Sequence, residues 1–168
     1  MGFPCSFQAV IPPSNMITFL IPTYNEKNNI KLLVNSIKKL SLKINYEILF
    51  VDDNSLDGSL EELLEVRKEN RNVNFIIREE KDRDLTQSLL LGLNKVSTRY
   101  TFVLDCDLQH DLQSIPHMFQ AIHDKNIDLV IGSRFLEPNQ SINLNFTRKI
   151  LSKIQVEVVL LEGAKPQF

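Results

Sequence analysis

The amino-acid sequence predicts an α/β fold, a mostly parallel sheet with helices on both faces. Short apolar runs alternate five times with segments whose apolar residues recur at helical spacing. The runs are apolar at nearly every position, as in strands that are covered on both faces. Polar clusters follow four of the five runs, where each segment would leave the sheet. Parallel strands joined by right-handed helical crossovers account for all three observations.

The first three strands are expected at residues 17–21, 46–51 and 73–77, which are short apolar runs bounded by polar or turn-forming residues. The connecting helices are expected at residues 26–40 and 59–69, because apolar residues recur there every three or four positions. The first half of the chain is therefore expected to form two consecutive strand–helix–strand units.

The second half continues the alternation. A helix capped by Asp84 is expected to run through Lys95, because an aspartate before an apolar helical pattern can accept bonds from the first backbone N–H groups. Strands are expected at residues 100–104 and 129–131, with a helix at residues 115–123 between them. A last helix is expected to begin near Phe146.

One domain accounts for most of the chain. The sequence has 168 residues, of which 43% are hydrophobic and 24% are charged, and this is typical of a single globular domain with its own core. Residues 16–145 are expected to form that domain. Residues 1–15, with three prolines, are expected to be a loose leader, and residues 146–168 a C-terminal helix and divergent tail.

Charge and cysteine content narrow the class of protein. The net charge is −2, so the chain lacks the basic field of a nucleic-acid-binding protein. Cys5 and Cys106 form neither a disulfide framework nor a zinc-binding spacing. The sequence shows no apolar stretch of about 18 residues and no signal peptide. A cytoplasmic location is expected, and peripheral association with the cytoplasmic membrane face stays open.

The polar clusters at the strand ends are expected to form the functional site. In open α/β sheets, ligands bind beyond the carboxyl ends of the strands, where neighbouring loops meet. Carboxylates and an arginine converge there, so an anionic, metal-assisted ligand is expected. The clusters lie at residues 22–26, 52–55, 105–109 and 132–134.

The cluster after the fourth strand carries two carboxylates. Asp105 and Asp107 are two residues apart, so in an extended chain their side chains would point the same way and Cys106 toward the core. Carboxylate oxygens suit Mg²⁺ or Mn²⁺, and Gln109 can add an amide oxygen. An Asp-x-Asp pair is common by chance, so this cluster alone is also compatible with a phospho-accepting aspartate or with a polar strand end.

Four segments taken together resemble a known family. IPTYNE, VDDNSLDGS, LDCDLQH and IGSRF occur in this order and are similar to motifs of family 2 glycosyltransferases, in the branch of the dolichol-phosphate (polyprenyl-phosphate) mannose synthases. The likeness covers roughly residues 16–136. It implies the Rossmann-like GT-A fold. It also implies metal-assisted transfer of a sugar, with inversion, from a nucleotide-sugar (GDP-mannose or a UDP-sugar) to a polyprenyl or dolichyl phosphate.

The resemblance also implies roles for individual residues. Asp107 and Arg134 would be catalytic. The divalent cation, Mg²⁺ or Mn²⁺, would be held by Asp105, Asp107 and Gln109. The donor would be bound by Pro22, Tyr24, Glu26, Asp52, Asp53, Asp105 and Arg134, with Asp52 the less firmly implied of the two neighbouring aspartates.

The implied acceptor removes the need for a general base. A phosphate monoester has a second pKa of about 6 and is already anionic at neutral pH. No base is therefore assigned, and His110, beside the expected metal ligands, is interpreted as a structural loop histidine. The charged residues 78–84 stand where many relatives are glycine-rich. They are interpreted as a solvated loop in which Arg78 or Arg83 can meet phosphate.

Two alternatives remain open from the sequence. The likeness fades after Arg134, and the acceptor-side segment of relatives is not recognised, so the chain could be a nucleotide-sugar-binding remnant without catalysis. The second alternative is a receiver-like domain in which Asp105 accepts a phosphoryl group, with Ser133 and Lys165-Pro166 as its partners. A full strand and helix before the acidic pair count against this alternative, because a receiver domain carries that pair after its first strand.

Overall fold

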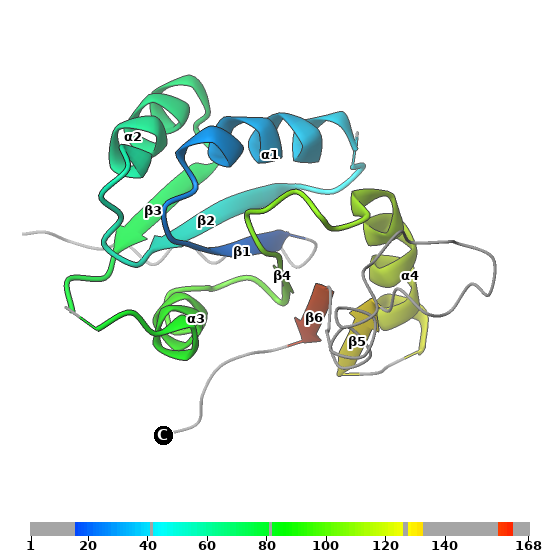
Figure 1. The fold of residues 1–168 in the computed structure, drawn as a ribbon. Coiled ribbons are helices and arrows are strands. Elements are labelled where there is room, and N and C mark those ends of the chain that lie inside the picture. Colours follow the sequence, from blue (N-terminus) through cyan, green and yellow to red (C-terminus); the bar gives the residue numbers. More distant parts are fainter. Residues whose placement is uncertain (1–15, 41, 81, 126–127, 133–157, 163–168) are drawn as a thin grey trace, which may run out of the picture.

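The computed structural model describes residues 16–162 except 41, 81, 126–127 and 133–157. Its centre is a six-stranded sheet with the strand order β3-β2-β1-β4-β6-β5 (Figure 1). The pairs β1–β2, β2–β3 and β1–β4 are parallel, whereas β6 runs antiparallel to both of its neighbours. The strands are β1 (Ile17–Thr23), β2 (Tyr46–Asp52), β3 (Val73–Ile77), β4 (Tyr100–Val103), β5 (Leu129–Gly132) and β6 (Val158–Glu162).

Helices cover both faces of this sheet. Figure 1 shows α1 and α2 above the sheet and α3 below it. Buried residues of α1, α2 and α4 belong to one hydrophobic cluster, and apolar residues of α3 pack in a second cluster. The predicted mostly parallel sheet with helices on both faces is therefore confirmed. The helices are α1 (Lys27–Lys39), α2 (Ser59–Glu69), α3 (Leu85–Leu93) and α4 (Ile115–Lys125), with a 3₁₀ turn at Leu112–Ser114.

The central strand β1 divides the core between the two faces. Phe19 and Ile21 belong to the cluster that contains α1, and Leu20 belongs to the cluster packed against α3. This follows from the period of two along a strand, because successive side chains point to opposite faces. All seven residues of β1 are buried, including Thr18 and Thr23, as expected for a central strand that is covered on both faces.

Glycine at position 92 allows α3 to lie close to β1. A Cβ atom built on Gly92 would come within 2.3 Å of Leu20 Cδ1 and 3.0 Å of Val51 Cγ2. Distances under 3.0 Å are essentially never seen for real Cβ atoms, so a larger residue would force the Leu20 side chain or the helix to shift. The close packing holds the C-terminal part of α3 against β1 and β2.

The sequence did not foresee β6. Residues 158–162 were expected within a C-terminal helix and divergent tail, but they pair with β4 and β5 inside the sheet. This pairing depends on contacts with residues more than 25 positions away, which no local pattern reports. Part of the expected tail thus belongs to the sheet. The expected leader at residues 1–15 and the expected helix near Phe146 lie outside the described residues.

Strand β1 continues two residues beyond the expected boundary, through Pro22 to Thr23. Proline is tolerated because Pro22 lies on the edge that faces β4, and that pairing stops at Leu20 and Val103. The last backbone bond on this side joins Leu104 N–H to Leu20 O, so the missing N–H of Pro22 removes no ladder bond. The end of β1 is therefore free on one side to line a pocket.

Within the described residues, no helix is long and apolar enough to cross a membrane.

Candidate functional site

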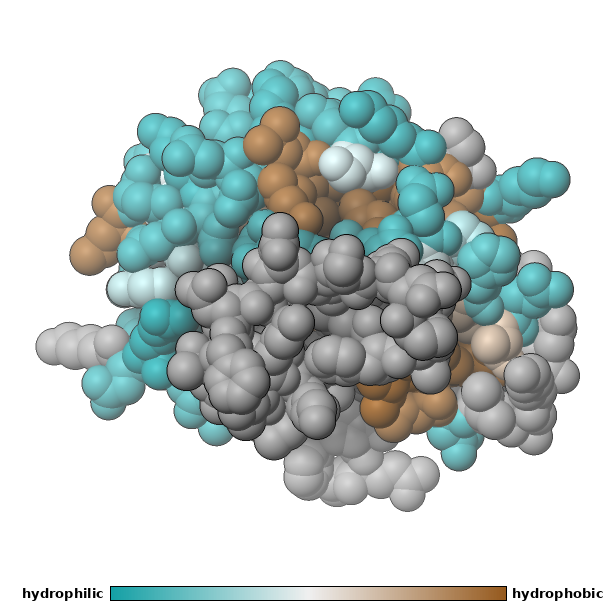
Figure 2. All heavy atoms as spheres, turned by 45° about the vertical axis from the view of Figure 1, so that its right-hand side comes forward, coloured by the Kyte–Doolittle hydropathy of each residue, from teal (hydrophilic) through white to brown (hydrophobic). Residues whose placement is uncertain are grey.

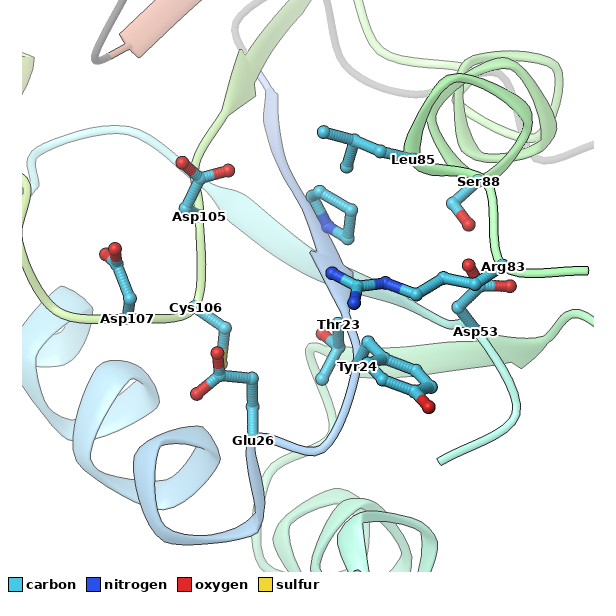
Figure 3. Close-up of a pocket in the computed structure, with 11 residues that line it drawn as sticks. Thr23, Tyr24, Glu26, Asp53, Arg83, Leu85, Ser88, Asp105, Cys106 and Asp107 are labelled. Carbon is cyan, nitrogen blue, oxygen red and sulfur yellow. The ribbon is translucent and has the colours of Figure 1, made fainter. Parts of the chain in front are cut away.

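A pocket of about 210 Å³ opens at the carboxyl ends of the parallel strands (Figure 3). It is formed by the loops that follow β1, β2 and β4 and by the start of α3. Six of the residues predicted from the sequence line it: Pro22, Tyr24, Glu26, Asp53, Asp105 and Asp107. Five further residues line it: Thr23, Arg83, Leu85, Ser88 and Cys106. Thr23 and Cys106 stand within the expected clusters without a ligand role, Arg83 was expected only as one of two arginines that can meet phosphate, and Leu85 and Ser88 were not expected there. The strand-end clusters thus converge as a parallel sheet requires.

Asp105 and Asp107 form one wall of this pocket. Figure 3 shows both carboxylates on the side opposite Asp53 and Ser88. Both residues are exposed, whereas Cys106 between them is 3% exposed and packs in the core. The expected alternation of outward carboxylates and an inward cysteine is therefore present at these three positions.

The chain turns immediately after these carboxylates. Leu108 has a φ of 62°, a left-handed conformation that is rare for a leucine. Because of this turn, Gln109 does not continue the alternation, and it is not among the lining residues. Its backbone N–H instead donates to Asp107 Oδ1 at 3.0 Å, which leaves Asp107 Oδ2 without a protein donor among the described residues.

His110 closes the same loop from inside. Its side chain is 4% exposed, and its Nε2 accepts the backbone N–H of Asp105 at 2.9 Å. Asp105 Oδ2 lies 3.6 Å from the same nitrogen. A buried imidazole that accepts a backbone N–H is occupied in holding the loop, in agreement with the structural role expected for this histidine.

The loops after β1 and β2 interlock on the other side of the pocket. The N–H of Asn25 donates to Ser55 Oγ at 2.8 Å, and the N–H of Glu26 donates to Ser59 Oγ at 3.0 Å. Asn25 adopts a φ of 55°, which asparagine tolerates better than most residues. These bonds position Tyr24 and Glu26 at the pocket, because the backbone on which they stand is held by the neighbouring loop.

The neighbouring aspartates Asp52 and Asp53 have different surroundings. Asp52 accepts from the N–H and the hydroxyl of Ser55, at 2.9 and 2.5 Å, and it is not a lining residue. Asp53 lines the pocket but also binds Arg78: its Oδ1 accepts from Nε at 2.6 Å, and the ion pair to the terminal nitrogen measures 2.5 Å. The N–H of Asp84 donates to Asp53 Oδ2 at 2.8 Å.

These contacts correct the interpretation of residues 78–84 as a solvated loop at one position, Arg78, because the other described residues of this segment are exposed as expected. Arg78 is 4% exposed and pairs with Asp53 inside the protein. It also donates to the backbone oxygen of Asp82. Arginine can remain charged at such a site because a carboxylate and a carbonyl share its N–H groups. The sequence did not indicate that Arg78 is buried, because its partner Asp53 lies 25 positions away.

Ser88 adds an unpartnered polar group to the pocket. It is 1% exposed, and its hydroxyl has no hydrogen-bond partner within the described part of the chain. Buried hydroxyls are nearly always bonded, so a lining hydroxyl without a partner indicates room for a ligand or for water. Its place on the buried side of α3 could be inferred from helical periodicity, but its lack of a partner could not.

Cys106 is a lining residue without nucleophilic character. Burial raises the pKa of its thiol to about 12, and the charges of Glu26, Asp107 and Asp105 act in the same direction. A hydrogen bond with Thr23 opposes these effects. Because the thiolate is the reactive form, this residue serves packing rather than covalent chemistry.

The acidic wall is chemically suited to a hard divalent cation. Asp105 and Asp107 offer exposed carboxylate oxygens, the ligand type that Mg²⁺ and Mn²⁺ prefer. Within the described residues no group of three or more His, Cys, Asp and Glu side chains could enclose a metal. Two carboxylates that leave other positions to water and phosphate are typical of nucleotide-bound Mg²⁺, so the residues fit such an ion.

The match to a protein-family model identifies the family to which this chain belongs. The model for glycosyl transferase family 2 matches residues 18–158, which is most of the chain. The chain belongs to glycosyl transferase family 2. Three of the four motifs that suggested this family contribute residues to the pocket, and residues 133–135 of the fourth, with Arg134, fall outside the described residues.

Similar curated proteins include several that are named dolichol-phosphate mannosyltransferase. The chain is 34% identical over 137 residues to the one from Pyrococcus furiosus, covering 82% of this chain and 38% of that protein. It is also 34% identical over 119 residues to the one from Saccharomyces cerevisiae, covering 69% of this chain and 43% of that protein. The chain therefore spans about two fifths of the length of these relatives.

A solved glycosyltransferase structure has the same fold. The mannosyltransferase PcManGT from Pyrobaculum calidifontis, determined with GDP-mannose and Mn²⁺, superposes with a TM-score of 0.66. The alignment covers 87% of this chain and 44% of that chain at 15% sequence identity, so it establishes the fold alone. The receiver-like alternative is excluded by the family match. Its proposed partners Ser133 and Lys165 lie outside the described residues.

Proposed function

We propose that this family 2 glycosyltransferase binds a nucleotide-sugar, GDP-mannose or a UDP-sugar, in the pocket at the ends of β1, β2 and β4. A divalent cation, Mg²⁺ or Mn²⁺, assists, and the sugar is transferred to a polyprenyl or dolichyl phosphate. The observation that carries the proposal is the convergence of six expected site residues on one pocket. The names of the curated relatives support the acceptor class.

Different residues of the pocket would bind the nucleoside of the donor and the cation. Tyr24, Glu26 and Asp53, with Pro22, would contact the nucleoside. Asp105 and Asp107 would hold the cation, with Gln109 as a further ligand if its loop turns inward. Arg134 stays a predicted phosphate contact. Asp52 is the least suited of the proposed donor-binding residues, because Ser55 occupies both of its carboxylate oxygens.

The proposed reaction needs charge neutralisation more than proton transfer. A phosphate oxygen of the acceptor would form a bond to the anomeric carbon as the bond to the donor diphosphate breaks, which inverts that carbon. No proton has to move, because a phosphate monoester with a second pKa of about 6 is already anionic. A bound cation would supply Lewis-acid stabilisation of the leaving diphosphate. The chain's own part is to orient the donor and to hold that charge.

Donor binding without transfer is the second candidate function. The chain spans only 38% and 43% of the two curated relatives, so more than half of each of those proteins has no counterpart in the alignments. Peripheral membrane association is part of the same proposal, because a lipid acceptor would require it. Assaying sugar transfer to a short-chain polyprenyl phosphate alongside donor binding separates the two functions.

Calorimetry with GDP-mannose and UDP-glucose, with and without Mn²⁺, tests the donor site. Metal-dependent binding of at least one donor is expected. Asp107→Ala should remove the metal-dependent gain in affinity while the fold survives, because this carboxylate is exposed. Glu65→Ala, which removes an exposed carboxylate on α2, is the matched control. If no sugar nucleotide binds with either metal, or if the Asp107 variant binds like wild type, the proposed site is wrong.

A further inference from the structure

The charges around the pocket are unevenly distributed. Four of its lining residues are acidic: Glu26, Asp53, Asp105 and Asp107. Arg83 is the basic residue among the lining residues described. Arg78 neutralises Asp53, and a divalent cation would offset Asp105 and Asp107. A donor diphosphate is itself an anion. Its binding therefore requires positive charge in addition to Arg78 and the cation, which only offset the carboxylates.

Arg83 extends across the pocket over Tyr24. Its guanidinium carbon lies 4.4 Å from the centre of the Tyr24 ring, a cation–π contact. Figure 3 shows the side chain reaching from the α3 side toward the middle of the pocket, above the ring. The contact uses one flat face of the guanidinium, and within the described residues its N–H groups have no hydrogen-bond or ion-pair partner. The edges of the group therefore stay free for a ligand.

The backbone on both sides of Arg83 is anchored. The carbonyl of Asp82 accepts from buried Arg78, and the N–H of Asp84 donates to Asp53 Oδ2 at 2.8 Å. Asp84 also caps α3, accepting from the N–H groups of Thr86 and Gln87 at 2.8 and 3.2 Å. Arg83 is thus an exposed side chain on a fixed backbone, and such a side chain loses less entropy when it binds a ligand.

We infer that Arg83 is a donor-binding residue whose guanidinium contacts the diphosphate of the nucleotide-sugar. The inference rests on the proposed function. The sequence left both Arg78 and Arg83 open as phosphate contacts, and the structure favours Arg83, because Arg78 is buried against Asp53 whereas Arg83 lines the pocket. Arginine suits this position because its planar group can stack on Tyr24 and still present two parallel N–H groups to phosphate oxygens. Lysine would keep the charge but lose the stack and the paired donors.

Titration with a ladder of ligands tests the assignment. The probes are guanosine, GMP and GDP, and uridine, UMP and UDP. Each is measured in the presence of Mn²⁺ by its displacement of whichever sugar nucleotide, GDP-mannose or UDP-glucose, binds more tightly. Arg83→Gln should weaken the diphosphate about 10- to 100-fold, the size expected for a lost charge-assisted contact, and leave the nucleoside within about twofold. Arg83→Lys should restore part of the loss. Arg71→Gln, an exposed change at the amino end of β3, is the control and should bind like wild type.

The possible outcomes are distinct. If Arg83→Gln binds nucleoside, monophosphate and diphosphate as wild type does, the assignment is overturned while the proposed function stands. Equal losses for nucleoside and diphosphate would also overturn it, because Arg83 would then act on the base. If wild-type protein binds none of the probes or sugar nucleotides, the proposed function fails and the assignment fails with it. Thermal melting of each variant verifies folding, which an exposed residue should not disturb.

Discussion

Asp53 and Arg78, 25 positions apart in the sequence, form an ion pair in which both side chains are 5% exposed. The pair joins the end of β2 to the loop that leads into α3. The second carboxylate oxygen of Asp53 accepts the N–H of Asp84, so Asp53 also positions the residue that caps α3. An aspartate expected to contact the nucleoside thus also organises the loop that carries Arg83.

The first prediction concerns this pair. Arg78→Met should lower the free energy of unfolding by about 3 to 5 kcal/mol, because Asp53 would be left as a buried charge without its partner. Urea denaturation measures the change. Lys31→Met, which breaks the exposed pair with Glu69, is the matched control and should cost no more than about 1 kcal/mol. Equal effects of the two substitutions would show that the buried pair does not stabilise the fold.

The second prediction concerns the packing of α3 on the sheet. Gly92→Ala should destabilise the protein by about 1 to 3 kcal/mol, because the added methyl group would overlap Leu20 and Val51. Helix propensity alone would predict stabilisation of about 1 kcal/mol, so the sign of the change separates the two effects. A double variant with Leu20→Ala should lose less than the two single variants together. A stabilised Gly92→Ala protein would mean that α3 lies farther from β1.

The third prediction concerns acid stability through Asp57, in the turn before α2. Burial acts to raise its pKa, but bonds from the Ser59 hydroxyl and from the N–H groups of Lys27 and Ser59 outweigh it and hold the pKa below the ordinary 3.8. A carboxyl whose pKa is lower in the folded state stabilises above its unfolded pKa, and this contribution is lost as the pH falls through the folded pKa.

Asp57→Ala should therefore be less stable than wild type near pH 7, and the difference should shrink as the pH falls below about 3.8. Urea midpoints measured between pH 7 and pH 3 give the comparison. Glu61→Ala, an exposed change in the first turn of α2, is the control. A difference that stays constant across this pH range would contradict the assigned bonds, because only the ionised carboxylate accepts them fully.

The fourth prediction concerns the thiol of Cys106. In a Cys5→Ser background, Cys106 should react with a thiol reagent at pH 8 only after unfolding, because a pKa of about 12 leaves well under roughly one thiol in a thousand ionised. Labelling rates with and without urea, followed by absorbance, measure this. Free glutathione serves as the unhindered reference. Rapid labelling of the native protein would show that the thiol is exposed or that its pKa is not raised.

Several elements of the fold could be predicted because their patterns are local. The helix at Ser59–Glu69 and the strand at Val73–Ile77 have the expected bounds, since apolar spacing and flanking polar residues specify them. The opposite orientations of Asp105 and Cys106 also follow from a local period of two. By contrast, β6 was not foreseen, because its place between β4 and β5 depends on pairing with distant strands.

The sequence by itself determined the family, the alternation of strands and helices, and the rim on which the polar residues would gather. Those features depend on short-range periodicity and on the shared direction of parallel strands. Only the tertiary structure decided which charges meet. It separated Asp52, occupied by Ser55, from Asp53, paired with Arg78, and it brought Arg83 onto Tyr24 across 59 positions. Such pairings depend on where crossovers return the chain, and no spacing along the sequence encodes that distance.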